Sequence, residues 1–331
     1  MPFIRGLDLA RMLYAEEVSP LLARRFAGLF YAAATLGMCS EVLGLDDEVS
    51  RDHEWGPRVT LFLSAEDHAR HASDVAGALR DGLPATFHGI PMVWRTSGVD
   101  LHDTRERALY HVSVRTVAMA LGFCGGSPPA GDPDWLRISE QHLLEFTSGA
   151  VYRDDAGDLS RAREALRYYP DNVLRFLLLH EWGAVNRHWF PIGRMGARGD
   201  RLGVRLQAGQ VARRLARVAF MVSRAYIPYE KWVGTLFAGL PVAAVLAPLL
   251  DGLLAETRWE RVEEWIAEAT AVLVQRQNAL GIAPAVPVES EPLDDGRHHV
   301  RGAFRRAWTA LAESLEPPLD ALLERQPSMF D

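Results

Sequence analysis

Lysine is almost missing from this sequence of 331 residues, since Lys231 is the only one and the remaining Lys and Arg positions are all arginine. Cysteine is nearly as rare: Cys39 and Cys124 are too few for a disulfide framework or a cysteine metal cluster. The N-terminus lacks the basic and apolar regions of a secretory signal peptide. We therefore expect a protein of the reducing cytoplasm.

Runs of basic residues are also missing. The formal net charge is −7 and no stretch of five or six basic residues occurs, so the electrostatic footprint of non-specific nucleic-acid binding is absent from the sequence. Residues 233–250 carry no charge and are about as long as a short transmembrane helix. Pro241 and Pro248 would interrupt a single helix there. We predict two short buried helices joined by a Gly-Leu-Pro turn, and no membrane partner.

The composition, 48% hydrophobic and 24% charged, is that of a globular protein, and the length allows two domains. Residues 1–125 mix helical and strand patterns, whereas nearly every segment after the Gly/Pro/Asp cluster at 125–133 has helical periodicity. We predict an α+β fold. A mixed α/β domain over 1–125 is followed by an all-helical domain over 126–331 that closes on the substrate.

Hydrophobic spacing gives the individual elements of this prediction. In the first part we expect a helix over 7–26, a buried strand over 29–36, a strand over 51–64, a helix over 65–83, and a strand pair over 85–94 and 108–116. In the second part we expect helices over 139–147, 160–168, 170–189, 207–226, 257–280 and 300–324.

Two acidic residues carry the candidate chemistry. On a strand, residues two apart point to the same face, so Asp52 and Glu54 would present neighbouring carboxylates. Mg²⁺ prefers such hard oxygen ligands, together with phosphate oxygens of a substrate. Upstream, a small-residue turn that includes Ser40 and Gly44 offers backbone N–H groups and a hydroxyl to phosphate oxygens. The pattern predicts a magnesium and phosphate site.

These residues resemble the nucleotidyltransferase superfamily that includes DNA polymerase beta and kanamycin nucleotidyltransferase. Its pattern is Gly-Ser, a further glycine and an acidic-x-acidic strand, and Ser40, Gly44, Asp52 and Glu54 occupy those places. More closely, the sequence is similar to an uncharacterised bacterial family of nucleotidyltransferase-like proteins, which shares the stretches at 149–154, 168–170 and 226–232.

The resemblance implies a reaction. A hydroxyl of a small-molecule acceptor would attack the α-phosphate of a nucleoside triphosphate, most simply ATP, and pyrophosphate would leave. Asp52 and Glu54 would hold the Mg²⁺. Two positions depart from the superfamily pattern: Cys39 stands where glycine is usual, and Ser113 stands on the strand where a third carboxylate is expected. Asp100, in a nearby loop, is a candidate to replace that acid and complete a second metal site.

Further candidates come from charge and chemistry. Arg51 could bind phosphate or pair with a nearby acid, and the same holds for Arg58. Lys231 is a compact charge suited to a triphosphate, and Tyr229 is a candidate nucleotide contact, with surface and core positions as their alternatives. Tyr226 is more typical of a core. The glycine-rich stretch 193–201 lacks the Gly-Lys-Ser/Thr of a P-loop and is expected to be a loop.

General-base and functional alternatives remain open. Glu140, Glu145 and Glu181 are candidate bases, although a solvated helix face is the default for each. The acceptor could instead be a protein, as in nucleotide-transferring toxins and antitoxins. A third hypothesis is a catalytically degenerate nucleotide-binding protein, motivated by Cys39 and Ser113.

Overall fold

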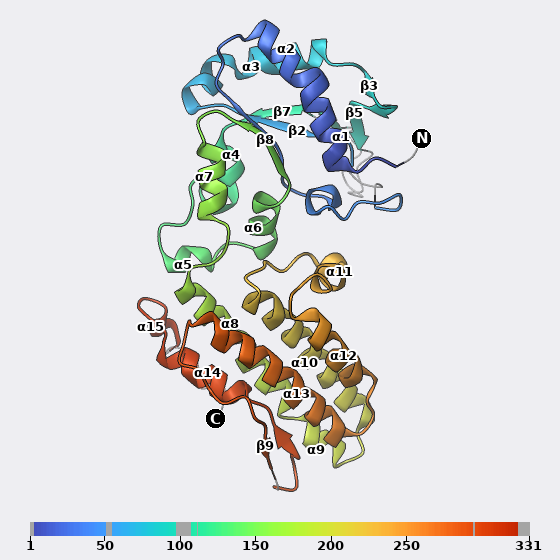
Figure 1. Cartoon of the computed structure of the whole chain (residues 1–331), viewed down its shortest axis with the longest axis vertical. Coiled ribbons are helices and arrows are strands. Elements are labelled where there is room, and N and C mark those ends of the chain that lie inside the picture. Colours follow the sequence, from blue (N-terminus) through green and yellow to red (C-terminus); the bar gives the residue numbers. More distant parts are fainter. Residues whose placement is uncertain (1–2, 51–54, 97–106, 111, 294, 324–331) are drawn as a thin grey trace. The chain divides into compact units, whose positions relative to one another are not determined.

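The fold was determined as a computed structural model that describes residues 3–50, 55–96, 107–110, 112–293 and 295–323 (Figure 1). The chain forms two compact units. Unit 1 comprises Met1–Pro129 and His142–Arg167, and unit 2 comprises Ala130–Gln141 and Tyr168–Asp331. Unit 1 contains a mixed sheet with helices and unit 2 is largely helical, so the predicted α+β class is confirmed.

The main sheet of unit 1 has four strands in the order β7-β2-β1-β8. Their bounds are Ala32–Thr35 for β1, Val59–Phe62 for β2, Val112–Arg115 for β7 and Ala150–Asp154 for β8. Strand β1 is antiparallel to β2 and β8, and β2 is parallel to β7. In the β1–β2 register Ala34 lies opposite Thr60, so the end of β1 lies beside the start of β2.

Helices of unit 1 supply the other half of its core. The helix predicted over 7–26 is α1 (Gly6–Leu13), a π turn (η1, Tyr14–Val18) and α2 (Ser19–Arg25) in succession, with Pro20 in the first turn of α2 where a missing N–H is tolerated. The helix α3 (Ala65–Gly82) matches its prediction. Leu9, Leu13 and Val75 join Leu61 of β2 in one buried cluster.

Two of the predicted strands are wrong in extent. Residues 55–58 are not in a strand, and β2 begins only at Val59, after Pro57. The segment predicted as one strand over 85–94 is a small hairpin followed by β5, because His88 and Gly89 both have positive φ and turn the chain. The strands concerned are β3 (Thr86–Phe87), β4 (Ile90–Pro91), β5 (Val93–Thr96) and its antiparallel partner β6 (Arg107–Tyr110).

Strand β8 was not predicted, because it lies in a region with otherwise helical periodicity. Its residues alternate between half-buried and exposed, which is the signal that a strand with one covered face gives. Gly149 precedes it with φ of 78°, and a Cβ there would overlap the carbonyl oxygen of Thr35. Only glycine allows β8 to approach β1 this closely.

Short helices complete unit 1 and its connections. These are α4 (Val117–Ala120), η3 (Leu121–Cys124), α5 (Asp132–Trp135), α6 (Glu140–Thr147) and α7 (Asp158–Ala165). The chain leaves unit 1 after Pro129, returns to it at His142 and leaves it again after Arg167. The helix α6 therefore begins in unit 2 and continues in unit 1.

Unit 2 is built on long helices. Its main helices are α8 (Asp171–Trp189), α10 (Arg201–Val222), α12 (Ala243–Ala255), α13 (Trp259–Leu280) and α14 (Phe304–Glu313). Shorter elements are α9 (Ile192–Gly196), η4 (Glu230–Trp232), α11 (Val233–Phe237), α15 (Asp320–Leu323) and the strand pair β9 (Glu291–Pro292) and β10 (Val300–Arg301). Helix α8 packs against α10 and α14, and these helices run side by side in Figure 1.

Two predictions for unit 2 can be compared directly with the structure. The uncharged stretch forms two helices, α11 and α12, as predicted, although Pro248 lies inside α12 and does not end it. The prediction that both helices are buried is wrong for α11, whose residues are all half-buried or exposed. The single helix predicted over 300–324 is wrong: β10, α14 and α15 occupy that stretch, and Pro317 and Pro318 exclude a continuous helix. Among the described residues, no helix has the length and apolar character that crossing a membrane requires.

Candidate functional site

The turn that follows β1 is the candidate phosphate loop, and we name residues 37–44 the serine bend. Gly37 has φ of 99° and Gly44 has φ of 68°, both in the region that favours glycine. Between them a 3₁₀ turn, η2 (Ser40–Leu43), begins at Ser40. No atom outside its neighbours lies within 4 Å of a Cβ built on Gly44, so φ alone requires glycine at this position.

Cys39 has an unusual backbone. Its φ is 96° and its ψ is 155°, a conformation that is almost confined to glycine and costs a side chain on the order of 1–3 kcal/mol. This is the position at which the superfamily pattern has glycine. Cys39 thus holds a backbone conformation that glycine adopts without strain.

Ser40 connects the serine bend to the segment that contains the predicted metal ligands. Its side chain is buried, and its hydroxyl donates a hydrogen bond to the carbonyl oxygen of Ser50 at 3.0 Å. The backbone N–H of Ser50 in turn donates to Asp47 Oδ1 at 2.7 Å. Ser50 directly precedes residues 51–54. Arg51, Asp52 and Glu54 lie outside the described residues, and so does Asp100.

Arg58 fastens the serine bend to the start of β2. Its Nη2 lies 2.7 Å from Oε1 of Glu41 and donates to the carbonyl oxygen of Met38 at 2.6 Å. The Thr35 hydroxyl donates to the Arg58 carbonyl oxygen. Of the two readings for Arg58, the structure therefore shows pairing with an acid.

Two buried acids, one within the serine bend and one two residues after it, were not foreseen. Glu41 is fully buried, and burial raises the pKa of its carboxyl despite the opposing effect of Arg58. Asp46 accepts hydrogen bonds from the Gly6 N–H at 2.6 Å and from Trp55 Nε1 at 2.9 Å. A Cβ at Gly6 would lie 2.6 Å from the Cβ of Glu41, so glycine is needed for this packing. Neither acid has a helical or strand pattern around it that marks it as buried.

Ser113 lies on β7 at the position predicted for a missing third acid. It is paired in register with Thr60 of β2, and its hydroxyl donates to Thr60 Oγ1 at 3.2 Å. Within the part of the chain that the structure describes, no group of three or more His, Cys, Asp or Glu side chains could hold a metal ion.

Lys231 and Tyr229 lie in unit 2, at η4. Both side chains are exposed, and the Lys231 ammonium stands 4.7 Å from the centroid of the Trp232 ring. The Tyr229 N–H donates to Gln141 Oε1 at 2.7 Å, which fixes the backbone of this turn. Tyr226 is buried among Tyr168 and Tyr169, with ring centroids 5.1 Å away in each case, and has the core position that was expected.

Glu140 and Glu181 do not lie on solvated helix faces, so that default is wrong for them. Arg217 Nη2 lies 3.0 Å from Glu140 Oε2, and its Nε lies 2.6 Å from Glu181 Oε1. Arg214 adds a contact of 3.3 Å to Glu181. This buried ion network joins the first residue of α6 to α8 and α10. Glu145, the third candidate base, is half-buried and belongs to unit 1.

Three tyrosines lie near Glu140 of the ion network. Burial raises the pKa of Tyr168, Tyr169 and Tyr226, and the negative charge of Glu140 raises each further. Burial also raises the pKa of Glu140, against the effect of Arg217. Arg217 contacts both Glu140 and Glu181 and so links α6 to α8 and α10, which favours a structural role for Glu140.

The glycine-rich stretch 193–201 is a loop, as predicted, only at 197–200. Its first part is α9, which packs against α13. A Cβ at Gly196 would overlap the Trp259 side chain, and a Cβ at Gly193 would overlap the Arg297 carbonyl oxygen. Asp200 then caps α10 by accepting from the Gly203 N–H at 2.8 Å. These glycines permit close packing of helices, which sequence alone does not separate from phosphate binding.

The chain is an α+β protein with a mixed four-stranded sheet. The turn at the end of β1 contains residues with positive φ, a conformation that favours glycine. Residues 135–233 match a family described as "Domain of unknown function (DUF4037)". The matched segment contains Glu140, Glu181, Arg217 and Lys231.

A solved structure also resembles the chain. It is the crystal structure of a nucleotidyltransferase-like protein from Exiguobacterium sibiricum 255-15, with a TM-score of 0.32 and 14% sequence identity over 82% of this chain and 77% of that chain. No curated protein matches the chain. The two matches assign neither a substrate nor a reaction to this chain.

Proposed function

We propose that this protein transfers a nucleotidyl group, most simply the adenylyl group of ATP, to a hydroxyl of a small-molecule acceptor. The observation that carries this proposal is the serine bend. Cys39 takes a glycine conformation where the resembled pattern has glycine, and the adjacent Ser40 contacts Ser50, just before the acidic pair Asp52 and Glu54.

Chain connectivity supports a shared site for the bend and the acids. One residue of extended chain spans at most about 3.6 Å, so the Cα of Asp52 can lie no more than about 7 Å from the Cα of Ser50. Two carboxylates and the oxygens of a phosphate form the donor set that Mg²⁺ prefers, so Asp52 and Glu54 are the residues that would hold it. When bound, Mg²⁺ would neutralise charge on the phosphate and lower the pKa of the attacking hydroxyl.

The remaining roles belong to the chain's own residues. Backbone N–H groups of the serine bend and the Ser40 hydroxyl would bind the outer phosphates, with Gly44 allowing the turn. Arg51 and Lys231 are the proposed charged contacts to the triphosphate, and Tyr229 is the proposed contact to the base. The acceptor oxygen bonds to the α-phosphorus as the bond to the bridging oxygen breaks. The hydroxyl proton passes to solvent and pyrophosphate leaves.

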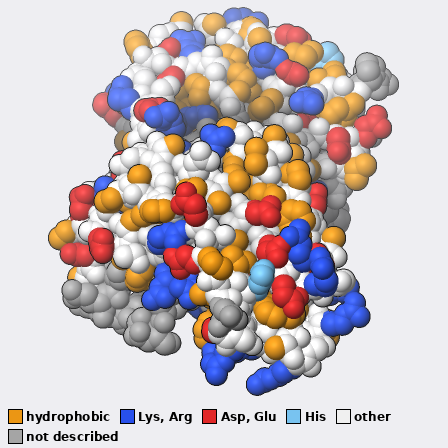
Figure 2. Space-filling view, turned by 60° about the horizontal axis from the view of Figure 1, so that its bottom comes forward, with side chains coloured by type: hydrophobic (Ala, Val, Ile, Leu, Met, Phe, Trp, Pro, Cys, Tyr) orange, Lys and Arg blue, Asp and Glu red, His pale blue; other side chains and the backbone are white. Residues whose placement is uncertain are grey.

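The charge distribution supports a small acceptor over a nucleic acid. The formal net charge is −7, and on the face shown in Figure 2 the arginine side chains are interspersed with acidic and hydrophobic ones. A nucleic-acid substrate is normally bound by clustered basic side chains that neutralise several phosphates. An acceptor with a single reactive hydroxyl needs no such surface.

The test replaces one proposed ligand at a time. We expect Asp52→Asn and Glu54→Gln each to abolish magnesium-dependent release of pyrophosphate from ATP in the presence of a panel of hydroxylated acceptors. The matched control is Glu66→Gln, which removes an exposed acid of unit 1 that pairs only with Arg70 among the described salt bridges. Unchanged release of pyrophosphate by Asp52→Asn would refute the assignment.

One observation favours a second candidate, a nucleotide-binding protein without turnover. Ser113 lies on β7 where the superfamily has an acid, and its hydroxyl donates a hydrogen bond to Thr60. Calorimetry that detects magnesium-dependent ATP binding, together with no pyrophosphate release across small-molecule and protein acceptors, would establish this candidate in place of the enzyme.

A further inference from the structure

A β-bulge interrupts the pairing of β8 with β1. In the register of the two strands Ala33 lies opposite Arg153 and Ala34 lies opposite Val151, so Tyr152 is an extra residue with no residue opposite it on β1. Bulges of this kind redirect a side chain and are frequent beside active sites. The direction of the Tyr152 side chain therefore differs from that in a regular strand.

The bulge brings two neighbouring side chains of β8 to one face of the sheet. Neighbours in a regular strand point to opposite faces. Here Arg153 Nη1 donates to the Tyr31 hydroxyl at 3.2 Å, and the Tyr152 hydroxyl donates to Thr35 Oγ1 at 2.9 Å. Tyr31 and Thr35 are four residues apart along β1 and the residue before it, so they share a face. Tyr152 thus reaches the last residue of β1, directly before the turn that leads into the serine bend.

Thr35 links Tyr152 to Arg58. Its side chain is buried, and a threonine hydroxyl has only one hydrogen to donate. That hydrogen goes to the Arg58 carbonyl oxygen, while the hydroxyl oxygen accepts from Tyr152. The Arg58 guanidinium in turn contacts the Met38 carbonyl oxygen at 2.6 Å and the Glu41 carboxyl at 2.7 Å. A chain of hydrogen bonds and an ion pair therefore leads from β8 to the serine bend.

The segment that contains Tyr152 also contacts the serine bend directly. The Gly37 N–H donates to the Glu145 carbonyl oxygen at 3.0 Å. Glu145 belongs to His142–Arg167, the same returning segment of unit 1 as Tyr152. This segment thus holds the first residue of the bend by a backbone hydrogen bond and holds Met38 through the contacts that begin at Tyr152.

We propose that Tyr152 is a positioning residue for the triphosphate: through Thr35 and Arg58 it holds the serine bend in the conformation that binds the outer phosphates. This inference rests on the proposed function, in which backbone N–H groups of the bend bind those phosphates. Such binding acts alike on bound ATP and on the transition state of transfer. Loss of the Tyr152 hydroxyl therefore weakens ATP binding and leaves the transfer step unchanged.

The first experiment measures the affinity of the full-length protein for ATP with Mg²⁺ by calorimetry. We expect Tyr152→Phe to weaken ATP binding about threefold to tenfold, the range that the loss of one hydrogen bond gives. The matched control is Tyr14→Phe, because Tyr14 stacks on Tyr152 while its hydroxyl contacts Tyr31 at 3.3 Å. This control should bind ATP as the wild type does. Equal ATP affinity in Tyr152→Phe and the wild type would overturn the assignment.

Kinetics separate positioning from a general loss of structure. In assays of pyrophosphate release, the KM of Tyr152→Phe for ATP should rise by the same factor as its dissociation constant, while kcat changes by less than about twofold. A lower kcat with an unchanged KM would show that Tyr152 does not act through phosphate binding.

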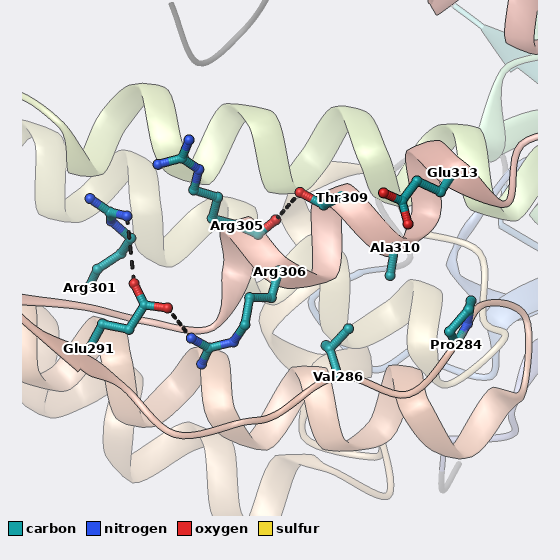
Figure 3. Close-up of a pocket in the computed structure, with 9 residues that line it drawn as sticks. All are labelled: Pro284, Val286, Glu291, Arg301, Arg305, Arg306, Thr309, Ala310 and Glu313. Atoms are coloured by element: carbon teal, nitrogen blue, oxygen red, sulfur yellow. Dashed lines mark hydrogen bonds and ion pairs between the residues drawn. The ribbon is translucent and has the colours of Figure 1, made fainter.

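Variants of Thr35 test whether Tyr152 acts through it. Thr35→Val removes the hydroxyl and should weaken ATP binding at least as much as Tyr152→Phe, whereas Thr35→Ser keeps the hydroxyl and should bind ATP within about twofold of the wild type. Thr309→Val is the control in unit 2, since the Thr309 hydroxyl also donates to a backbone carbonyl oxygen, that of Arg305, at 3.1 Å (Figure 3). Adding Tyr152→Phe to Thr35→Val should cause no further loss, because two residues that act as one unit are not additive. Additive losses would contradict the proposed link.

Hydrogen exchange tests the positioning without a nucleotide. Backbone amides of the serine bend should exchange faster in Tyr152→Phe and in Thr35→Val than in the wild type or Tyr14→Phe. Unchanged exchange of these amides would also overturn the assignment. The two proposals fail in different ways. A wild type that bound no ATP would refute the proposed function, whereas equal binding by the wild type and Tyr152→Phe would remove only the role of Tyr152.

Discussion

The Ser40 hydroxyl donates its hydrogen bond to the Ser50 carbonyl oxygen across 3.0 Å. This single contact holds two stretches of chain together that the sequence separates by ten residues. It also occupies the only hydrogen that the hydroxyl can donate, so phosphate binding at the serine bend relies chiefly on backbone N–H groups unless the hydroxyl rotates. Arg58 reinforces the same arrangement through Glu41 and the Met38 carbonyl oxygen.

Cys39→Gly should stabilise the protein. The wild-type φ of 96° costs a cysteine on the order of 1–3 kcal/mol, whereas glycine adopts it freely and loses up to about 1 kcal/mol through the flexibility of the unfolded chain. We expect a net gain of about 1 kcal/mol in the free energy of unfolding, measured by urea denaturation. Cys39→Ala is the matched control, because it keeps the Cβ and should be no more stable than wild type. A gain in Cys39→Ala equal to that of Cys39→Gly would contradict the explanation.

Glu41 should make stability depend on pH. Its pKa in the folded protein is raised above the ordinary value of 4.5, mainly by burial, so the folded state retains this proton to higher pH than the unfolded chain does. The stabilisation is complete below 4.5 and is lost as the pH rises through the folded pKa. Glutamine at position 41 has no proton to lose. We therefore expect the free energy of unfolding of Glu41→Gln to increase relative to that of the wild type as the pH rises from 4 to 7.

Denaturation curves for Glu41→Gln, Glu66→Gln and wild type at several pH values test this directly. Glu66 carries its carboxylate on the surface, and its replacement should leave the difference from wild type small throughout. A difference between Glu41→Gln and wild type that stays constant, or that changes in the opposite sense, would count against a buried proton at this site.

Arg217→Met should destabilise unit 2 strongly. It leaves the buried carboxylate of Glu181 and the half-buried carboxylate of Glu140 without their main partner, and loss of one member of a buried pair costs about 3–5 kcal/mol. The comparison is Arg213→Met on the same helix, whose partner Glu230 is exposed and for which about 0–1 kcal/mol is expected. Thermal and urea unfolding of both variants measure the contrast. Similar losses of unfolding free energy in the two variants would show that the ion network does not stabilise unit 2.

The proposed contact between Lys231 and the triphosphate can be tested by selective labelling of its amine. It is the only lysine of the chain and is exposed, so an adenosine acyl phosphate, which acylates amines close to a bound nucleotide, has one side-chain target. If Lys231 contacts the triphosphate, mass spectrometry should find it labelled and protected by excess ATP. A simple amine-reactive ester should label it with or without ATP. Labelling by the nucleotide probe that ATP does not reduce would remove Lys231 from the proposed site.

Much of the fold was predictable because apolar periodicity reports burial. The helix α3 and the two helices of the uncharged stretch could be predicted from the spacing of their apolar residues and from the glycines between them. Strand β8 was missed because its alternating pattern is short and lies among helical ones, and because its partner β1 lies far away in sequence. The early end of the predicted helix at 300–324 follows from Pro317 and Pro318, which local reasoning could have used.

The candidate site was predictable only in part. Ser40 and Gly44 were found by resemblance, and their backbone angles fit a tight turn. Glu41, Asp46 and Glu181 were missed or misjudged because an acidic residue beside apolar ones looks the same in sequence whether it faces solvent or a buried hydrogen-bond donor. The partner that decides the matter comes from a distant segment, as Arg58 does for Glu41 and Arg217 does for Glu181.

The pairing of β8 with β1 bears on how the protein is made. During synthesis, β1 leaves the ribosome long before residues 150–154 exist, so one side of the nascent sheet stays open until the chain has passed through part of unit 2 and come back. An unpaired strand edge invites association with other chains. The late-arriving strand, admitted by Gly149, then pairs with the open side of β1 and becomes the edge strand of the sheet in its place.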